Sequence, residues 1–114
     1  MGLFSRWRRR GAATTGRPSR SGGSGPDSAH LEAFARSRTG VEAYVEPATN
    51  VTPTTLLLIA QDGEWTRRRV PDPATAGAFA RRVGIPVYDV NLTGYPQKMR
   101  DWTARRRQEE RGAG

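Results

Sequence analysis

The chain has 114 residues and no cysteine, and its 19 basic residues outnumber 11 acidic ones to give a formal net charge of +8. The lack of cysteine excludes a disulfide framework and a thiolate site, and no apolar run approaches the roughly 18 residues of a membrane-spanning helix. The fold must therefore depend on packing within one small domain. No apolar secretion segment follows the basic start, so we expect a cytoplasmic protein.

The positive charge lies at the two ends of the chain. Residues 1–26 carry six arginines and no acid, residues 27–95 are close to neutral, and residues 96–114 hold six basic and three acidic residues. Within the first of these segments, Gly, Ser, Thr and Pro predominate after the tenth residue, which is typical of disorder. We expect a disordered basic tail over residues 1–26, a single domain over residues 27–108 and a frayed C-terminus over residues 109–114.

The first ten residues have the pattern of an anion-binding segment. Drawn as a helix, they place Leu3, Phe4 and Trp7 on one face. The arginines around this face are Arg6, Arg8, Arg9 and Arg10. This arrangement is typical of a short interfacial anchor for anionic phospholipid, which would hold the protein at the inner face of the membrane. Arginines can also contact nucleic-acid phosphates, and a basic start that binds nothing in particular is the third interpretation.

Two elements are predicted before the middle of the chain. Residues 27–38 have apolar positions at spacings of three and four, which predicts a helix capped by Asp27 or Ser28. Residues 41–46 alternate between apolar and polar side chains, which indicates a strand with one buried face and with Tyr44 on the other.

The strongest local pattern is a β-hairpin at Asp62-Gly63. Residues 54–61 and 64–70 flank this dipeptide, which suits a two-residue type I′ turn and would place Leu58 opposite Arg67. The unbroken apolar run of the first strand predicts a central strand, whereas the arginines of the second predict an edge.

The edge strand carries three consecutive arginines. Alternation along a strand places Arg67 and Arg69 on one face and Arg68 on the other. Arg67 and Arg69 are therefore a candidate anion patch, and the alternative is a solvated edge that prevents aggregation.

The second half of the chain predicts a helix, a strand and a last helix. Asp72-Pro73 begins the first helix and Gly84 ends it, residues 85–90 form the strand, and the last helix begins near Tyr95. In that helix the apolar positions are Tyr95, Met99 and Trp102. The fold class is therefore α+β, with the element order α-β-β-β-α-β-α and helices packed on a small, mostly antiparallel sheet.

No pattern of catalytic residues emerges. His30 is the one histidine of the chain, which excludes a multi-histidine metal site, and we expect it to face solvent or to cap the helix. The candidates for one cleft after the fourth strand are Tyr88, Asp89, Tyr95 and Asp101, although the sequence alone does not bring them together. We assign no catalytic, metal-binding or cofactor-binding residue and expect no cofactor.

Four stretches carry a resemblance to a known group of proteins: GVEAYVEP, LLLIAQDGEWTRRRV, GIPVYDV and GYPQKMRDW. Together with the MGLFSR-type start they resemble a family of short, uncharacterised actinobacterial proteins, some of which are automatically labelled oxidoreductase. This resemblance implies no established activity and no functional residues. No redox cysteine or dinucleotide-binding pattern accompanies the label.

The order α-β-β-β-α-β is also similar to the core of restriction-endonuclease-like nucleases. Those enzymes place an acid near the second strand and an acid-x-lysine motif on the third, to hold a metal ion. The corresponding stretch here is Glu64-Trp65-Thr66, which lacks the lysine, and the second strand has no acid before Asp62.

The sequence thus favours a small non-catalytic interaction module. Its arginine-rich ends are expected to engage an anionic partner, either membrane phospholipid or nucleic acid. The alternative is a small enzyme, either an oxidoreductase or a degenerate nuclease.

Overall fold

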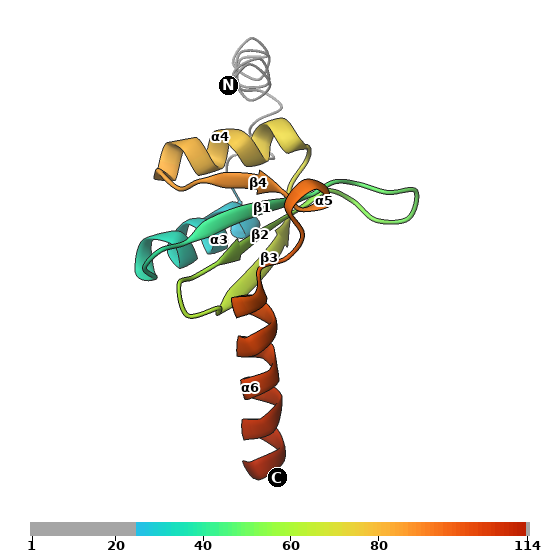
Figure 1. The fold of residues 1–114 in the computed structure, drawn as a ribbon. Coiled ribbons are helices and arrows are strands. Elements are labelled where there is room, and N and C mark those ends of the chain that lie inside the picture. The colour runs from blue at the N-terminus through green and yellow to red at the C-terminus, as the bar shows by residue number, and fades with distance from the viewer. Residues whose placement is uncertain (1–24, 114) are drawn as a thin grey trace.

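A computed structural model of the chain describes residues 25–113. Within this range the elements are α3 (Pro26–Ser37), β1 (Glu42–Glu46), β2 (Thr55–Ile59), β3 (Trp65–Arg69), α4 (Pro73–Val83), β4 (Val87–Asp89), α5 (Val90–Thr93) and α6 (Gln97–Ala113) (Figure 1). The predicted α+β class is confirmed, as is the order of its seven elements. The short helix α5 is an addition that the sequence did not indicate.

The first helix begins differently from the prediction. Its N-cap is Gly25, which offers no side chain, and Pro26 occupies the first turn. Asp27 and Ser28 therefore lie inside the helix instead of capping it. In contrast, α4 has the predicted ends, because the Asp72 carboxylate accepts a hydrogen bond from the Thr75 amide (2.8 Å).

The four strands form one mixed sheet in the order β3-β2-β1-β4. The pairings β1 with β2 and β2 with β3 are antiparallel, and β4 runs parallel to β1. The predicted central position of β2 and edge position of β3 are therefore confirmed. Strand β1 is central as well. Tyr44, which we expected on an open face, is only 6% exposed, because it lies in a small apolar cluster and the Tyr88 ring packs on it.

The hairpin between β2 and β3 has a three-residue loop, so the predicted two-residue turn was wrong. Leu57 lies opposite Arg67, and the Ala60 amide donates to the Glu64 carbonyl (2.8 Å). The loop ends in Gly63, whose φ is 97°. A glycine with positive φ at the last position is typical of three-residue hairpin loops, and the dipeptide Asp-Gly suits both loop types.

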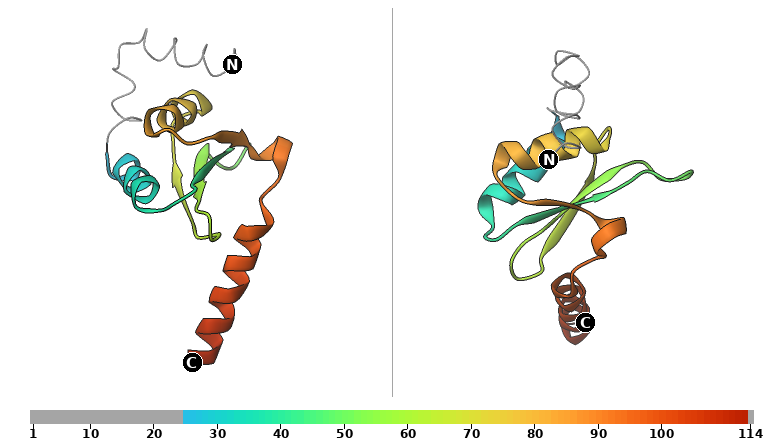
Figure 2. Two further views of the ribbon diagram at one scale, coloured as in Figure 1. Left: turned by 60° about the vertical axis from the view of Figure 1, so that its left-hand side comes forward. Right: turned by 45° about the horizontal axis from the view of Figure 1, so that its top comes forward.

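Helices α3 and α4 lie on the same face of the sheet (Figure 2). They contribute Leu31, Phe34, Ala76, Phe79 and Ala80 to the larger apolar core. The other face holds a smaller core of Tyr44, Leu57 and Ile59, against which Trp65 and Met99 pack. The sheet is thus fully covered on one face and covered in part on the other.

Helix α6 begins over the second face and then projects away from the rest of the fold (Figure 1). Tyr95 precedes this helix, and Trp102 is half-buried at its side. From Ala104 to Gly112 every residue is exposed. The helix continues to Ala113, so residues 109–113 of the end that we expected to be frayed lie within α6. None of the helices described is both long and apolar enough to cross a membrane.

Candidate anion-binding surfaces

The structure places the two residues of the predicted anion patch on one face of the sheet. Arg67 and Arg69 pair with Leu57 and Thr55 of β2, on the side opposite α3 and α4. Arg68 lies on the other side, where its Nε is 3.4 Å from Oδ1 of Asp27. The other predicted site residues, Leu3, Phe4, Arg6, Trp7, Arg8, Arg9 and Arg10, lie outside the described residues.

Arg67 is not an open anion site, because Glu46 binds it. Nε of Arg67 donates to Oε1 of Glu46 (2.7 Å) and Nη2 donates to Oε2 (2.9 Å), which is the bidentate geometry of a strong ion pair. The same carboxylate accepts the hydroxyls of Thr55 (2.7 Å) and Tyr95 (2.5 Å). Four donor groups, from β2, β3 and the segment before α6, therefore meet on one acidic side chain of β1.

The hydrogen bonds outweigh desolvation at Glu46, whose side chain is 14% exposed. Burial raises the pKa of Glu46, but the hydrogen bonds from Arg67, Tyr95 and Thr55 together lower it below its ordinary value. In return, the Glu46 carboxylate raises the pKa of both Arg67 and Tyr95. Glu46 is therefore ionised at neutral pH and neutralises Arg67.

The lowered pKa of Glu46 predicts a specific loss of stability in acid. A carboxylate whose pKa is lower in the folded than in the unfolded state stabilises the fold above its unfolded pKa, and this contribution disappears as the pH falls through its folded pKa. Unfolding by urea should show that Glu46→Gln destabilises the protein at about pH 6 and less at about pH 3, because protonation of Glu46 in acid removes the charge that distinguishes it from glutamine. An equal penalty at both pH values would contradict an ionised Glu46.

An open depression of about 790 Å³ lies beside this ion pair. Its wall includes all three arginines of β3, the loop between β1 and β2, Asn91 of α5 and Tyr95. Arg67 is bound by Glu46 and Arg68 by Asp27. Among residues 25–113 the Arg69 side chain forms no hydrogen bond or ion pair, so it carries the uncompensated charge of the depression.

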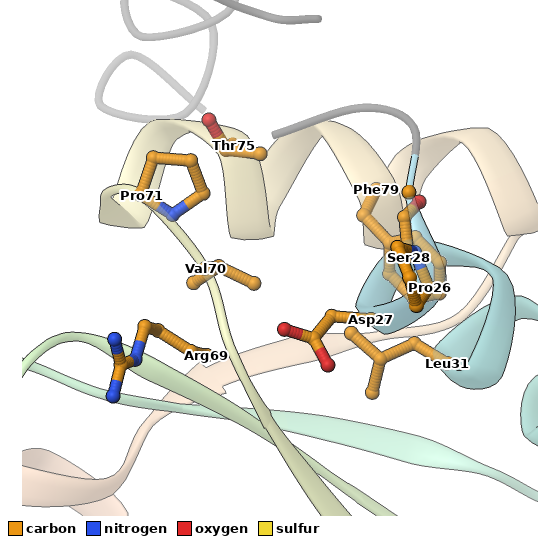
Figure 3. A pocket seen from close by; sticks show the side chains of 10 residues that line it. Pro26, Asp27, Ser28, Leu31, Arg69, Val70, Pro71, Thr75 and Phe79 are labelled. Carbon is orange, nitrogen blue, oxygen red and sulfur yellow. The ribbon is translucent and has the colours of Figure 1, made fainter. Parts of the chain in front are cut away.

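A second cavity of about 100 Å³ lies between the starts of α3 and α4 and the end of β3 (Figure 3). Its wall combines apolar side chains, among them Leu31, Val70 and Phe79, with polar ones such as Asp27 and Thr75. The guanidinium of Arg69 is directed away from these side chains in Figure 3. The Arg69 guanidinium therefore does not point into this cavity, and its positive charge is accessible on the exposed side of β3.

Helix α6 presents a second basic surface. At 3.6 residues per turn, Arg100, Arg107 and Arg111 lie within about 20° of one line along the helix and span about 16 Å. Arg107 and Arg111 have no side-chain partner within the described range, and Arg100 donates only to the Gln97 side chain (3.0 Å). We call these three residues the α6 arginine stripe.

The acidic residues of α6 lie away from the α6 arginine stripe. Glu110 is near Arg106 (3.7 Å), and Asp101 accepts from the Gln97 amide (3.0 Å). Glu109 is half a turn from the stripe. The stripe therefore keeps its positive charge toward solvent, since none of these carboxylates neutralises it.

The four residues considered for one cleft have separate surroundings. The ring of Tyr88 packs on Tyr44, with centroids 5.3 Å apart. Asp89 caps α5 by accepting the Asn91 amide (2.8 Å). Only Tyr95 of the four contributes to the depression, while Asp101 lies on α6. They do not form a common site.

The residues considered for catalysis are held in structural contacts. Nε2 of His30 is 2.6 Å from Oγ1 of Thr66, so this histidine is half-buried against β3 and does not cap the helix. The Glu64 carboxylate binds Arg38 (2.6 Å), and Asp62 accepts the Glu64 amide (2.9 Å). In the part of the chain that the structure describes, no group of three or more His, Cys, Asp or Glu side chains could hold a metal ion.

Sequence reasoning did not identify the central role of Glu46 or the α6 arginine stripe. Glu46 was assigned to an open strand face, and the partners that bind it are 9, 21 and 49 residues away along the chain. The stripe had a detectable signal, because its spacing of seven and then four residues is helical. Arg111, the last residue of the stripe, falls in the segment over residues 109–114 that we had expected to be frayed. Comparison with family models, curated proteins and solved structures gave no match for this chain.

Proposed function

We propose that the protein is a non-catalytic interaction module that binds nucleic acid, with the α6 arginine stripe on the phosphates. The observation that carries this proposal is that α6 projects from the fold (Figure 2) and that its Arg100, Arg107 and Arg111 are aligned by the helical repeat and exposed. Aligned guanidinium groups on a projecting helix can reach a phosphate backbone without obstruction from the body of the protein.

The composition of α6 favours nucleic acid over phospholipid as the partner of this helix. An interfacial lipid-binding helix needs an apolar face that inserts below the headgroups. Beyond the half-buried Trp102, the exposed turns contain Arg, Gln, Glu, Gly and Ala and no large apolar side chain. Phosphate binding requires no such face, because the affinity arises from counterion release.

Salt-dependent binding to duplex DNA tests this proposal. Replacing Arg107 and Arg111 with Gln should weaken binding to a labelled 20-base-pair duplex, measured by fluorescence anisotropy. The slope of log K against log salt should also become shallower by about 2, at about 0.9 for each phosphate contact. The control is Arg81→Gln with Arg82→Gln on α4, which removes the same formal charge from another surface and also breaks the ion pair of Arg82 with Glu32 (2.9 Å).

Two results would contradict the nucleic-acid proposal. If the two double variants weaken DNA binding equally, net charge alone accounts for the affinity. If anionic vesicles bind the chain and DNA does not, the partner is phospholipid. In that case Phe4→Ser with Trp7→Ser should abolish vesicle binding, because the apolar side chains of the N-terminal segment must insert.

The enzyme alternatives have distinct signatures. A flavin or haem that copurifies in stoichiometric amount would favour an oxidoreductase, and metal-dependent cleavage of the duplex would favour a nuclease. Either result would replace the binding proposal.

A further inference from the structure

The depression beside β3 combines one uncompensated cation with a polar wall. Two acids and three arginines line it. Glu46 pairs with Arg67 and Asp27 pairs with Arg68, so the positive charge of Arg69 is not compensated. An isolated guanidinium on a concave surface attracts an anion, and its planar set of donors matches the oxygens of carboxylate or phosphate.

The remaining free polar groups of the wall are mainly donors or hydroxyls. The Asn91 side chain makes no hydrogen bond within the described part of the chain. The hydroxyls of Thr49 and Thr52 share one hydrogen bond (2.7 Å), so one of their two hydrogens stays available. The carboxylate oxygens of Glu46 are already occupied by its donors. The wall therefore suits a ligand with several acceptor oxygens.

Hydrogen bonds fix both sides of the depression before any ligand binds. On one side, Glu46 holds Arg67 and Tyr95. On the other side, the amide of Thr49 donates to the Thr52 carbonyl (2.9 Å), which closes the loop between β1 and β2 on itself. A site whose walls are fixed in advance loses less conformational freedom on binding.

The size and the walls of the depression indicate more than a bare inorganic anion. Its volume of about 790 Å³ lies in the range of small-molecule sites. Pro47, Pro53 and Val90 supply apolar wall, and the ring of Tyr95 stands at its side. These groups can contact the organic part of a ligand while Arg69 binds its charged end.

We infer that this depression binds a phosphomonoester group on an organic carrier, with the phosphoryl oxygens on Arg69. Phosphate is favoured over carboxylate because a dianion with three terminal oxygens can use Arg69, Asn91 and a threonine hydroxyl together. The site shares no residue with the α6 arginine stripe, so it stands or fails independently of nucleic-acid binding.

The test is a titration of the full chain at constant ionic strength. NMR signals of the backbone and arginine side-chain N–H groups are the readout. The probes are ribose 5-phosphate, inorganic phosphate and ribose. Ribose 5-phosphate should give saturable shifts confined to Arg69, Asn91 and Tyr95, with tighter binding than inorganic phosphate and no effect of ribose. Arg69→Gln should weaken this binding by about tenfold, the scale of a charge-assisted hydrogen bond to phosphate.

Arg81→Gln is the matched control, because Arg81 is also exposed and has no side-chain partner among residues 25–113. It should leave the affinity for ribose 5-phosphate unchanged. Vesicles containing phosphatidic acid form the second arm: Arg69-dependent binding to them without binding of ribose 5-phosphate would assign the phosphomonoester to a lipid headgroup. Equal weakening by Arg69→Gln and Arg81→Gln, or shifts spread over all exposed arginines, would overturn the site.

Discussion

Truncation of Leu58 to alanine is expected to lower the free energy of unfolding by about 3–5 kcal/mol, the upper part of the range for buried Leu→Ala changes. Leu58 is fully buried in the larger core, between the sheet and the two helices α3 and α4. Because both layers are fixed by their own secondary structure, the cavity left behind cannot collapse easily. A loss of this size is a large part of the stability of a small domain.

Leu57→Ala is the matched control for this measurement. Leu57 is also fully buried and is the adjacent residue of β2, but it points to the smaller core. The flexible side chain of Met99 packs against that core, so the cavity can be filled in part and the expected loss is about 2–3 kcal/mol. Urea denaturation monitored by far-ultraviolet circular dichroism measures both losses. A larger penalty at Leu57 would show that the second face carries the principal core.

The comparison of these two leucines shows how much of the fold the sequence could predict. The continuous apolar run of β2 indicated a strand buried on both faces, and the structure confirms it with Leu57 and Leu58 both at 0% exposure. This signal is local, because one strand covered on two sides needs no polar position. The ends of α4 were predictable for the same reason, since Asp72 and Gly84 act on their own helix.

The errors arose where distant segments determine the structure. The alternation in β1 indicated one open face, but Tyr44 is covered because β4 pairs alongside and the Tyr88 ring packs on it. The hairpin register shifted by one residue, because Asp-Gly is compatible with two loop lengths. For the anion patch, alternation along the strand predicted that Arg67 and Arg69 share a face. It did not predict that Glu46 neutralises Arg67, because this ion pair depends on strand pairing that no local pattern encodes.

A second large effect is expected where α6 meets the hairpin loop. Gly63 is buried, has φ of 97° and lies against the first turns of α6. A Cβ added there would be 2.1 Å from the carbonyl oxygen of Lys98 and 2.9 Å from Cβ of Trp102. Both are backbone or near-backbone atoms, so the contact cannot be relieved by rotation of a flexible side chain. Gly63→Ala should therefore displace α6 from the sheet.

Gly84→Ala separates the two causes of destabilisation, which are backbone strain and the steric contact with α6. Gly84 also has positive φ, 78°, but an added Cβ there would meet nothing within 4 Å. Its substitution should cost only the backbone strain, about 1–2 kcal/mol. Gly63→Ala adds an overpacking penalty of about 1–3 kcal/mol, so it should be the more destabilising of the two by that amount.

Hydrogen exchange determines where the extra penalty at Gly63 arises. If α6 is held by its close approach to the hairpin loop, Gly63→Ala should remove the protection of amides near Met99 and Trp102 while the amides of β1 and β2 keep theirs. Exchange should stay unchanged at those α6 positions in Gly84→Ala, because that residue closes α4. The α6 arginine stripe gives this docking a functional consequence, because a 17-residue helix released from the fold is only marginally stable in water, and its unfolding would remove the alignment of Arg100, Arg107 and Arg111. DNA binding by Gly63→Ala should then weaken toward that of the Arg107→Gln with Arg111→Gln variant, although no charge has been removed. Unchanged α6 protection in Gly63→Ala would mean that the loop, and not the helix, moves to accommodate the methyl group.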